Sequence, residues 1–265
     1  MEERTARDGT TLALRHWAVQ GPKAAILLVH GFGEHSGRYE HVARFFNDRQ
    51  FDVTGFDLRG HGLSGGRRGH VAHWSDYLDD VEDMLLETRS RGVPVVLYGH
   101  SHGGLIAISY AESDRPQPDA LIASAPGFQD NLKPILHVIS KILGSLLPTQ
   151  AVALGITADQ LSRDPAVGKA YFADPLVLTK ATLGFGAQTL RARAETIQHL
   201  GRISVPTLTI QGSEDSLVPP TASALLEPYA KRILYTGLRH EVHNEPEQAQ
   251  VLDDIASWVE SQFQA

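Results

Sequence analysis

The sequence predicts an α/β protein in which a mostly parallel β-sheet is flanked by helices and interrupted by one inserted segment. Six apolar runs recur along the 265 residues, and segments with helical spacing lie between several of them. The apolar runs are continuous rather than alternating, which is typical of strands that are buried on both faces. A chain that repeats strand and helix in this way forms a parallel sheet wrapped by helices.

Local patterns place the individual elements. The stretch "SDYLDDVEDMLLETRSR" at 75–91 has apolar residues at helical spacing, and "EPEQAQVLDDIASWVESQF" at 245–263 is the last helix candidate. The opening stretch "TARDGTTLALRHWAV" at 5–19 contains a D-G turn signal and predicts an antiparallel hairpin at one edge of the sheet. The strand candidates are "KAAILLVHG" (23–31), "FDVTGFDLRG" (51–60), "VPVVLYGHS" (93–101), "DALIASAPG" (119–127), "VPTLTIQGS" (205–213) and "KRILYTGLRH" (231–240).

The composition excludes several classes of function. The formal net charge of −7 argues against a nucleic-acid partner, because phosphate backbones require clustered Lys and Arg. The chain has no cysteine, which excludes disulfides, thiolate metal sites and cysteine nucleophiles. The first residues lack the apolar core of a signal peptide, and no uncharged apolar run approaches the roughly 20 residues of a membrane span. We therefore expect a cytoplasmic protein.

The regular alternation of strands and helices breaks between about residues 127 and 186. The stretch "PILHVISKILGSLLP" at 134–148 predicts an amphipathic helix with a broad apolar stripe. Such a helix could belong to the core of the main domain. Its place directly after a strand, where ligand-facing loops lie, favours an inserted cap instead. We expect a core formed by residues 1–126 and 187–265 and a cap formed by residues 127–186.

Two stretches match the pattern G-x-S-x-G, "GHSHG" at 99–103 and "GLSGG" at 62–66. A nucleophile elbow needs a strand before the serine and a helix after it. Ser101 has both, because "VPVVLY" precedes it and "GGLIAISYAES" follows. Ser64 has neither, since the glycines after it are poor helix formers. Ser101 is therefore the expected nucleophile, the alternative being a structural serine in a tight turn, and Ser64 is expected to be a loop residue.

The two histidines beside Ser101 are poorly placed to act as its base. Neighbouring side chains of an elbow point away from the nucleophile, whereas a base must approach its oxygen to within about 3 Å. The useful group of His102 is its backbone amide at a helix N-terminus, which can hold an oxyanion. Phe32, in "HGFGEHSG", is the candidate for the second amide. A phosphate-binding loop is the alternative for this glycine-rich stretch. However, neither of the phosphate-binding patterns G-x-x-x-x-G-K-[ST] and G-x-G-x-x-G follows the strand.

The acid and the base are expected late in the chain, in the order Ser, acid, His. "GSEDS" follows a late strand and supplies Glu214 and Asp215, of which we favour Asp215. "RHEVHN" follows the last strand and supplies His240 and His243. His240 comes first after the strand and is the expected base. The H-E-V-H spacing is one residue short of the zinc-binding H-E-x-x-H, so no metal site is expected.

These residues together resemble the α/β-hydrolase fold, and within it the chain resembles the monoacylglycerol lipases. "HGFGEHSGRY" is similar to the family's H-G-x-G-E-H-S-G-R-Y, and "DLRGHGLSGG" to its D-x-x-G-H-G-x-S-x-G. "LSRDPAVGKAYFADPLV" resembles the family's cap exit, and "YTGLRHEVHNEPE" its histidine loop. The resemblance runs over nearly the whole chain, which makes it more specific than a shared fold.

The resemblance implies roles for further residues. It makes Ser101 the nucleophile, Asp215 the acid and His240 the base, with the amides of Phe32 and His102 as the oxyanion hole. It also implies that four residues surround a glycerol head group: Glu34, Arg38, Tyr171 and His243. Purely structural alternatives are a salt bridge between Arg38 and Glu34 and packing of Tyr171 in the cap. The chain departs from the family at His102, where methionine is usual.

The expected reaction is hydrolysis of a monoacylglycerol to glycerol and a fatty acid through an acyl-enzyme, without a cofactor. The alternatives are a general carboxylesterase or a lysophospholipase with the same triad, and, more distantly, a non-catalytic binding module of the same fold. The expected partner is a small lipid substrate, with transient contact between the apolar cap helix and lipid surfaces.

Overall fold

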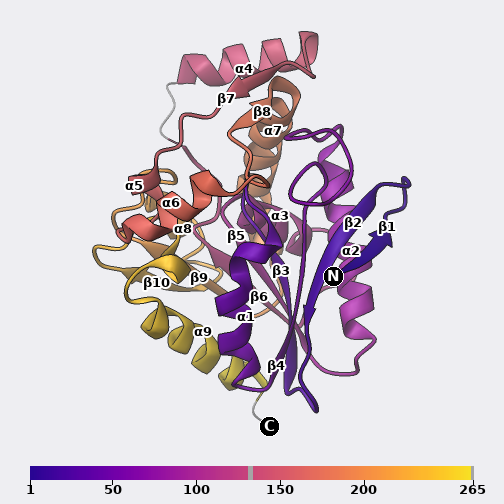
Figure 1. The fold of residues 1–265 in the computed structure, drawn as a ribbon, viewed down its shortest axis with the longest axis vertical. Helices are drawn as coiled ribbons and strands as arrows, with labels where there is room; N and C mark the ends of the chain where they lie inside the picture. Colours follow the sequence, from indigo (N-terminus) through magenta and orange to yellow (C-terminus); the bar gives the residue numbers. More distant parts are fainter. Residues whose placement is uncertain (131–133, 264–265) are drawn as a thin grey trace.

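The computed structural model describes residues 1–130 and 134–263, and its centre is a twisted eight-stranded sheet in the order β1-β2-β4-β3-β5-β6-β9-β10 (Figure 1). β1 and β2 run antiparallel, as do β2 and β4, and the other neighbours are parallel. The strands are β1 (Glu2–Thr5), β2 (Thr11–Trp17), β3 (Ala24–Val29), β4 (Phe51–Phe56), β5 (Val95–His100), β6 (Ala120–Ser124), β9 (Thr207–Gly212) and β10 (Lys231–Tyr235).

The central strands are buried along their whole length, which confirms the interpretation of the continuous apolar runs. Every residue of β3, β4, β5, β6 and β9 is buried. Two apolar clusters cover the two faces of the sheet. Helices α1 (Glu40–Asn47) and α9 (Gln248–Phe263) contribute to one cluster, and helices α2 (Trp74–Arg89), α3 (His102–Ala111) and α7 (Leu183–His199) contribute to the other. The predicted α/β architecture is therefore confirmed.

The sequence signals for the outer elements were accurate in part. The predicted hairpin is present as β1 and β2 at one edge of the sheet. The two quoted helices correspond to α2 and α9. Helix α1 was not singled out from the sequence, although its amphipathic stretch "EHVARFFN" buries three apolar residues. Short elements complete the core, namely the 3-10 helices Ser36–Tyr39, Leu200–Arg202 and Val242–Asn244, and helix α8 (Thr221–Ala224).

The segment after β6 forms a separate group of elements beyond the carboxyl ends of the strands (Figure 1). It comprises α4 (Pro134–Leu146), β7 (Ala151–Ala153), α5 (Ala158–Leu161), α6 (Pro165–Ala173) and β8 (Lys180–Thr182), and β7 pairs with β8. Helix α4 packs against α7. Because α7 is one continuous helix from Leu183 to His199, the boundary expected after residue 186 falls inside it.

This group is fastened to the loops that follow the core strands. The Leu178 amide donates to the Gly33 carbonyl at 2.7 Å, and the Glu241 amide donates to the Leu161 carbonyl at 2.8 Å. These bonds connect the segment after β6 to the loop after β3 and to the loop after β10. None of the described helices, all within residues 1–130 and 134–263, is long and apolar enough to cross a membrane.

Candidate active site

Ser101 lies in a sharp turn between β5 and α3. Its φ of 54° and ψ of −114° place a non-glycine residue in a strained region of backbone space. The glycines around it are required by close packing: a Cβ on Gly99 would lie 2.2 Å from the Gly103 carbonyl oxygen, and a Cβ on Gly103 would lie 2.1 Å from the Val29 carbonyl oxygen. This is the geometry of a nucleophile elbow.

Ser64 is used differently. It is buried in the loop after β4, where its hydroxyl donates to the Asp57 carbonyl and accepts from the Ala13 amide at 2.9 Å. The side chain of Asp57 in turn accepts from the Leu63 amide at 2.9 Å and from the side chain and amide of Ser36. Ser64 is therefore a loop-fixing residue, as its sequence context indicates.

His240 and Asp215 are joined by a hydrogen bond from the ring Nδ1 to the carboxylate Oδ2, at 2.8 Å. A carboxylate only accepts, so the proton of a neutral His240 lies on Nδ1 and its Nε2 is a free acceptor. Asp215 is itself held by the amides of Leu217 and Val218, at 3.0 and 2.9 Å, and by Gln211 Nε2 at 3.0 Å. The loop after β9 thus fixes the carboxylate before substrate arrives.

The environment of His240 makes it a better base than a free histidine. Burial alone would lower the pKa of His240, but the charge and hydrogen bond of Asp215 outweigh that effect and raise the pKa above its usual value. His240 must be neutral to accept a proton. Activity that depends on His240 should therefore rise with pH through this raised pKa.

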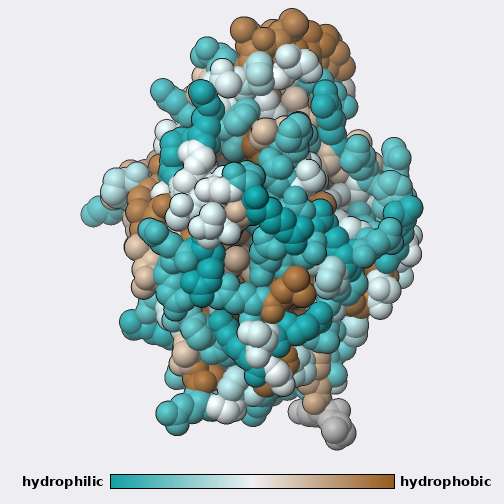
Figure 2. All heavy atoms as spheres, turned by 90° about the vertical axis from the view of Figure 1, so that its right-hand side faces the viewer, coloured by the Kyte–Doolittle hydropathy of each residue, from teal (hydrophilic) through white to brown (hydrophobic). Residues whose placement is uncertain are grey.

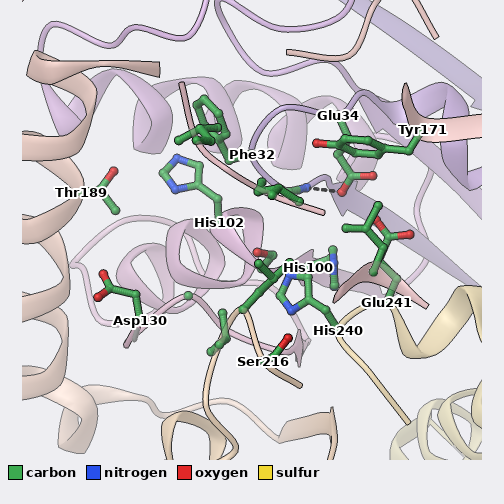
Figure 3. A pocket seen from close by; sticks show the side chains of 18 of the residues that line it. Phe32, Glu34, His100, His102, Asp130, Tyr171, Thr189, Ser216, His240 and Glu241 are labelled. Carbon is green, nitrogen blue, oxygen red and sulfur yellow. Dashed lines mark hydrogen bonds between the residues drawn. The ribbon is translucent and has the colours of Figure 1, made fainter. Parts of the chain in front are cut away.

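Ser101 and His240 line one cavity of about 380 Å³, to which the segment after β6 contributes Leu154, Ile156, Leu161 and Tyr171. Figure 3 shows His240 among the side chains around it. No hydrogen bond joins them within the described part of the chain. In enzymes without substrate this contact is often loose, and it tightens when the substrate binds. The rest of the wall is largely apolar, with side chains that include Leu154, Ile156, Leu161, Phe185, Leu217 and Val218.

Neither of the two histidines that flank Ser101 forms a hydrogen bond with it in the described part of the chain. The Nδ1 of His100 lies 3.2 Å from the Ser124 hydroxyl, and its ring centroid lies 4.9 Å from that of His240. The His102 ring lies among aromatic side chains, 4.8 Å from Phe185 between centroids. Burial, followed by neighbouring positive groups, lowers the pKa of both histidines well below the usual value. Neither His100 nor His102 is therefore positioned to act as the base for Ser101, as the geometry of the elbow predicts.

The backbone amides expected to form an oxyanion hole have no other use. Phe32 follows β3, and His102 is the first residue of α3. In residues 1–130 and 134–263, neither amide donates a hydrogen bond. The helix N-terminus adds a positive partial charge at His102. Both residues line the cavity beside Ser101.

Glu34 organises the loop that carries Phe32. Its Oε1 accepts from the Gly31 amide at 2.6 Å and from the Tyr39 hydroxyl at 2.8 Å, and its Oε2 accepts from Arg38 at 2.6 Å. The same guanidinium of Arg38 grips Glu241 through two bonds of 2.7 and 2.8 Å. Burial would raise the pKa of Glu241, but Arg38 lowers it to about 2, so Glu241 is ionised at neutral pH.

Of the four residues expected around a head group, the structure brings two to the cavity. Glu34 and Tyr171 line it, and the Tyr171 hydroxyl has no partner within the described residues. Arg38 lies behind them, with its guanidinium carbon 4.8 Å from the centre of the Tyr171 ring. The expected salt bridge between Arg38 and Glu34 is present. Tyr171 reaches the site from helix α6.

His243 is not on the cavity wall, contrary to the expectation from the resemblance. It is fully buried, stacked on Tyr39 with ring centroids 4.9 Å apart, and at 4.8 Å from the His100 ring. Neither of its ring nitrogens has a partner in the part of the chain that the structure describes. Burial lowers the pKa of His243 to about 3, so the ring is neutral. In this structure it supports the floor of the site rather than touching a ligand.

The structure also places residues in the wall that the sequence did not single out. They include Glu241, next to the expected base, and three polar residues on another part of the wall, Asp130, Thr189 and Arg193. Glu241 adjoins His240 in sequence, which was the only available signal. No cluster of three His, Cys, Asp or Glu side chains suited to a metal ion occurs among the described residues.

Comparisons with known proteins agree with this geometry. A family model described as serine aminopeptidase, S33, matches residues 20–247. The chain belongs to this family.

Individual relatives are more specific. A monoacylglycerol lipase from Mycolicibacterium smegmatis is 36% identical over 259 residues, covering 91% of this chain and 89% of that protein. Phospholipase YtpA from Bacillus subtilis is 30% identical over 247 residues, covering 89% and 94%. The crystal structure of the Paleococcus ferrophilus monoacylglycerol lipase superimposes with a TM-score of 0.87 at 29% identity, covering 95% of this chain and 99% of that one. The resemblance to the monoacylglycerol lipases, and with it the α/β-hydrolase fold, is confirmed.

The pKa of His240 gives a direct test of its partner. Asp215→Asn removes the charge that raises this pKa, so the acidic limb of kcat/KM for a p-nitrophenyl ester should move to lower pH. The turnover at the plateau should fall by about four orders of magnitude, because the ring loses its fixed tautomer. A variant whose acidic limb stays in place would show that Asp215 does not set the pKa of the base.

Proposed function

We propose that this protein is a serine hydrolase that cleaves monoacylglycerols to glycerol and a free fatty acid through an acyl-enzyme. The observation that carries the proposal is the His240–Asp215 pair, whose histidine lines the same mainly apolar cavity as a serine held in a strained elbow. The named relatives supply the substrate class, since two of those compared are monoacylglycerol lipases.

Each step follows from the positions of these groups. His240 Nε2 takes the proton of Ser101 as its Oγ attacks the ester carbonyl, while Asp215 keeps Nδ1 protonated and stabilises the charged ring. The amides of Phe32 and His102 hold the oxyanion, and losing one such donor typically costs about 3–4 kcal/mol. Glycerol leaves with the proton from His240. Water then attacks the acyl carbonyl while His240 takes one of its protons, and the acyl–Oγ bond breaks. The fatty acid leaves and His240 returns the proton to Ser101.

The glycerol end of the substrate is assigned to the side of the cavity that holds Glu34, Tyr171 and Glu241 (Figure 3). Glycerol carries hydroxyl groups that both donate and accept hydrogen bonds. The carboxylates of Glu34 and Glu241 accept, and the unpartnered hydroxyl of Tyr171 donates or accepts. Arg38 holds both carboxylates in place from behind.

A lysophospholipase is the second candidate, because one relative is a phospholipase. The charge of the site argues against it. Two buried carboxylates, Glu34 and Glu241, share the single guanidinium of Arg38, so a phosphate placed at this end meets a net negative charge. A general carboxylesterase would need no polar head-group end. A non-catalytic binding module would have no use for the strained serine or the ordered His240–Asp215 pair.

Side-by-side turnover tests the substrate class. We expect the highest kcat/KM for monoacylglycerols, a lower value for p-nitrophenyl esters of the same acids, and the lowest for lysophospholipids. Tyr171→Phe removes the unpartnered hydroxyl and should raise KM for monoacylglycerols by roughly threefold to tenfold, the value of one hydrogen bond. The same variant should leave KM for the p-nitrophenyl esters unchanged. Slowest turnover on monoacylglycerols would refute the proposal.

Residues 127–186 are proposed to act as a cap, with α4 as the part that meets a lipid surface. Figure 2 shows hydrophobic side chains gathered at the end of the molecule where Figure 1 places α4. Their exposure is large, reaching 60% at Ile135 and 71% at Leu146. Such a patch suits a protein that collects an amphiphilic substrate from a membrane or droplet.

Vesicle binding tests this surface. Ile142→Asp combined with Leu146→Asp should weaken sedimentation with phospholipid vesicles by at least about tenfold, since each side chain exposes apolar area that would transfer into lipid. Leu234→Asp, at an exposed apolar residue of β10, is the matched control and should bind as the wild type does. Turnover of a water-soluble ester should survive in both variants. Equal vesicle binding by all three proteins would refute the role of α4.

A further inference from the structure

The cavity has a second polar side, which the proposed reaction does not use. His102 and Thr189 lie on the side opposite Glu34, Tyr171 and Glu241 (Figure 3). The side chains of His102 and Thr189 are more than nine-tenths buried. The proposed function assigns glycerol to the other side, so this side receives the acyl chain. A plain hydrocarbon chain offers a polar side chain nothing to bind.

His102 occupies an aromatic cage. Its ring lies near those of Phe32, Trp74, Tyr77 and Phe185, with centroid distances between 4.8 and 6.2 Å. Its Nε2 is buried and has no hydrogen-bond partner in residues 1–130 and 134–263. Burial lowers the pKa of His102 well below the usual value, so the ring is neutral and has one donor and one acceptor nitrogen.

Thr189 belongs to the same wall. Phe185, Thr189 and Arg193 follow one another at four-residue spacing on α7 and therefore share one face of the helix, and all three line the cavity. Thr189 thus lies one turn from the ring against which His102 packs. Its Oγ1 also lacks a partner within the described residues. Arg193 differs, because it donates to the Gly127 carbonyl at 2.6 Å and pairs with Asp130.

Two unpaired polar atoms in one wall indicate a ligand that pairs them. A buried donor or acceptor without a partner is costly, and such atoms in native proteins commonly have a functional reason. We propose that His102 and Thr189 form a polar acyl subsite that binds a hydroxyl group on the acyl chain of the substrate. A hydroxyl both donates and accepts, which matches a neutral imidazole and a threonine hydroxyl.

The position of the hydroxyl follows from the elbow. The backbone amide of His102 is one of the two proposed oxyanion donors, so its side chain begins beside the ester carbonyl. The subsite therefore suits a hydroxyl within the first few carbons of the acyl chain. Both atoms are covered in the empty cavity, so a side-chain rotation accompanies binding, as is common at binding sites. The inference rests on the proposed function for the direction of the acyl chain.

Paired substrates test the subsite. We would measure kcat/KM for glycerol monodecanoate and for the analogues with a hydroxyl on the second, third or fourth carbon. The wild type should prefer at least one hydroxylated ester to the plain ester by about tenfold, the value of one or two hydrogen bonds. His102→Met and Thr189→Val should each reduce the ratio of kcat/KM for the hydroxylated ester to kcat/KM for the plain ester to a value between about 1 and 3. Thr189→Ser keeps the hydroxyl and should retain the preference.

The ratio between substrates separates recognition from a change in overall activity or stability. If the His102 ring serves only to pair with the equally unpartnered Tyr77 hydroxyl, His102→Met changes thermal stability but not the ratio, which would overturn the proposal. No preference for any hydroxylated ester in the wild type would overturn it as well. Thr189→Val provides the test if His102→Met does not fold.

The p-nitrophenyl esters of the same acids distinguish this inference from the proposed function. A hydroxyl preference on these esters without turnover of glycerol esters would refute the proposed substrate class and support the subsite. Rapid turnover of glycerol esters with no hydroxyl preference would support the substrate class and refute the subsite alone.

Discussion

The site depends on one buried ionic cluster, in which the Arg38 guanidinium forms salt bridges with both Glu34 and Glu241. Glu34 fixes the loop after β3 through the Gly31 amide, and Glu241 adjoins His240 in the loop after β10. The guanidinium therefore joins the loop that carries one proposed oxyanion amide to the loop that carries the proposed base. Removing one partner of such a buried pair typically costs about 3–5 kcal/mol, because a charge is left uncompensated. The same two carboxylates give the proposed glycerol end its acceptor character.

The segment after β6 connects the same two loops by backbone hydrogen bonds. It donates from Leu178 to Gly33 in the first loop and accepts at Leu161 from Glu241 in the second. Tyr171, on the same segment, lies over the Arg38 guanidinium. The proposed cap is thus hydrogen-bonded to both loops that carry the proposed catalytic groups, and the cavity beneath it is mainly apolar. The strain at Ser101 is sustained by the close packing of Gly99 and Gly103 below it.

Local sequence patterns were sufficient where the structure is decided locally. The strand before Ser101 and the helix after it distinguish this serine from Ser64 as the candidate nucleophile. In the structure the Ser64 hydroxyl forms hydrogen bonds within its loop and to β2. The pairing of His240 with Asp215 was expected from chain order, from the position of each residue after a strand, and from the family resemblance. The expected boundary at residue 186 falls inside α7, because the sequence pattern does not show that the helix already begins at Leu183.

Other features depend on contacts between distant parts of the chain. Arg38 and Glu241 are 203 residues apart, so no local pattern pairs them. His243 lies in a short 3-10 helix, and the sequence does not show that its ring turns toward Tyr39 instead of the cavity. The imidazole of His102 marked a departure from the family in the sequence. The sequence does not show that Phe185 of α7 packs against this ring, or that Thr189 of the same helix lines the same cavity.

Ser101 alone is proposed to carry the acyl group during turnover. Intact-protein mass spectrometry after reaction with a fluorophosphonate, followed by peptide mapping, tests this claim most directly. We expect one adduct per chain, on Ser101, which is lost in Ser101→Ala and retained in Ser64→Ala. An adduct that persists in Ser101→Ala, or that maps to Ser64, would contradict it.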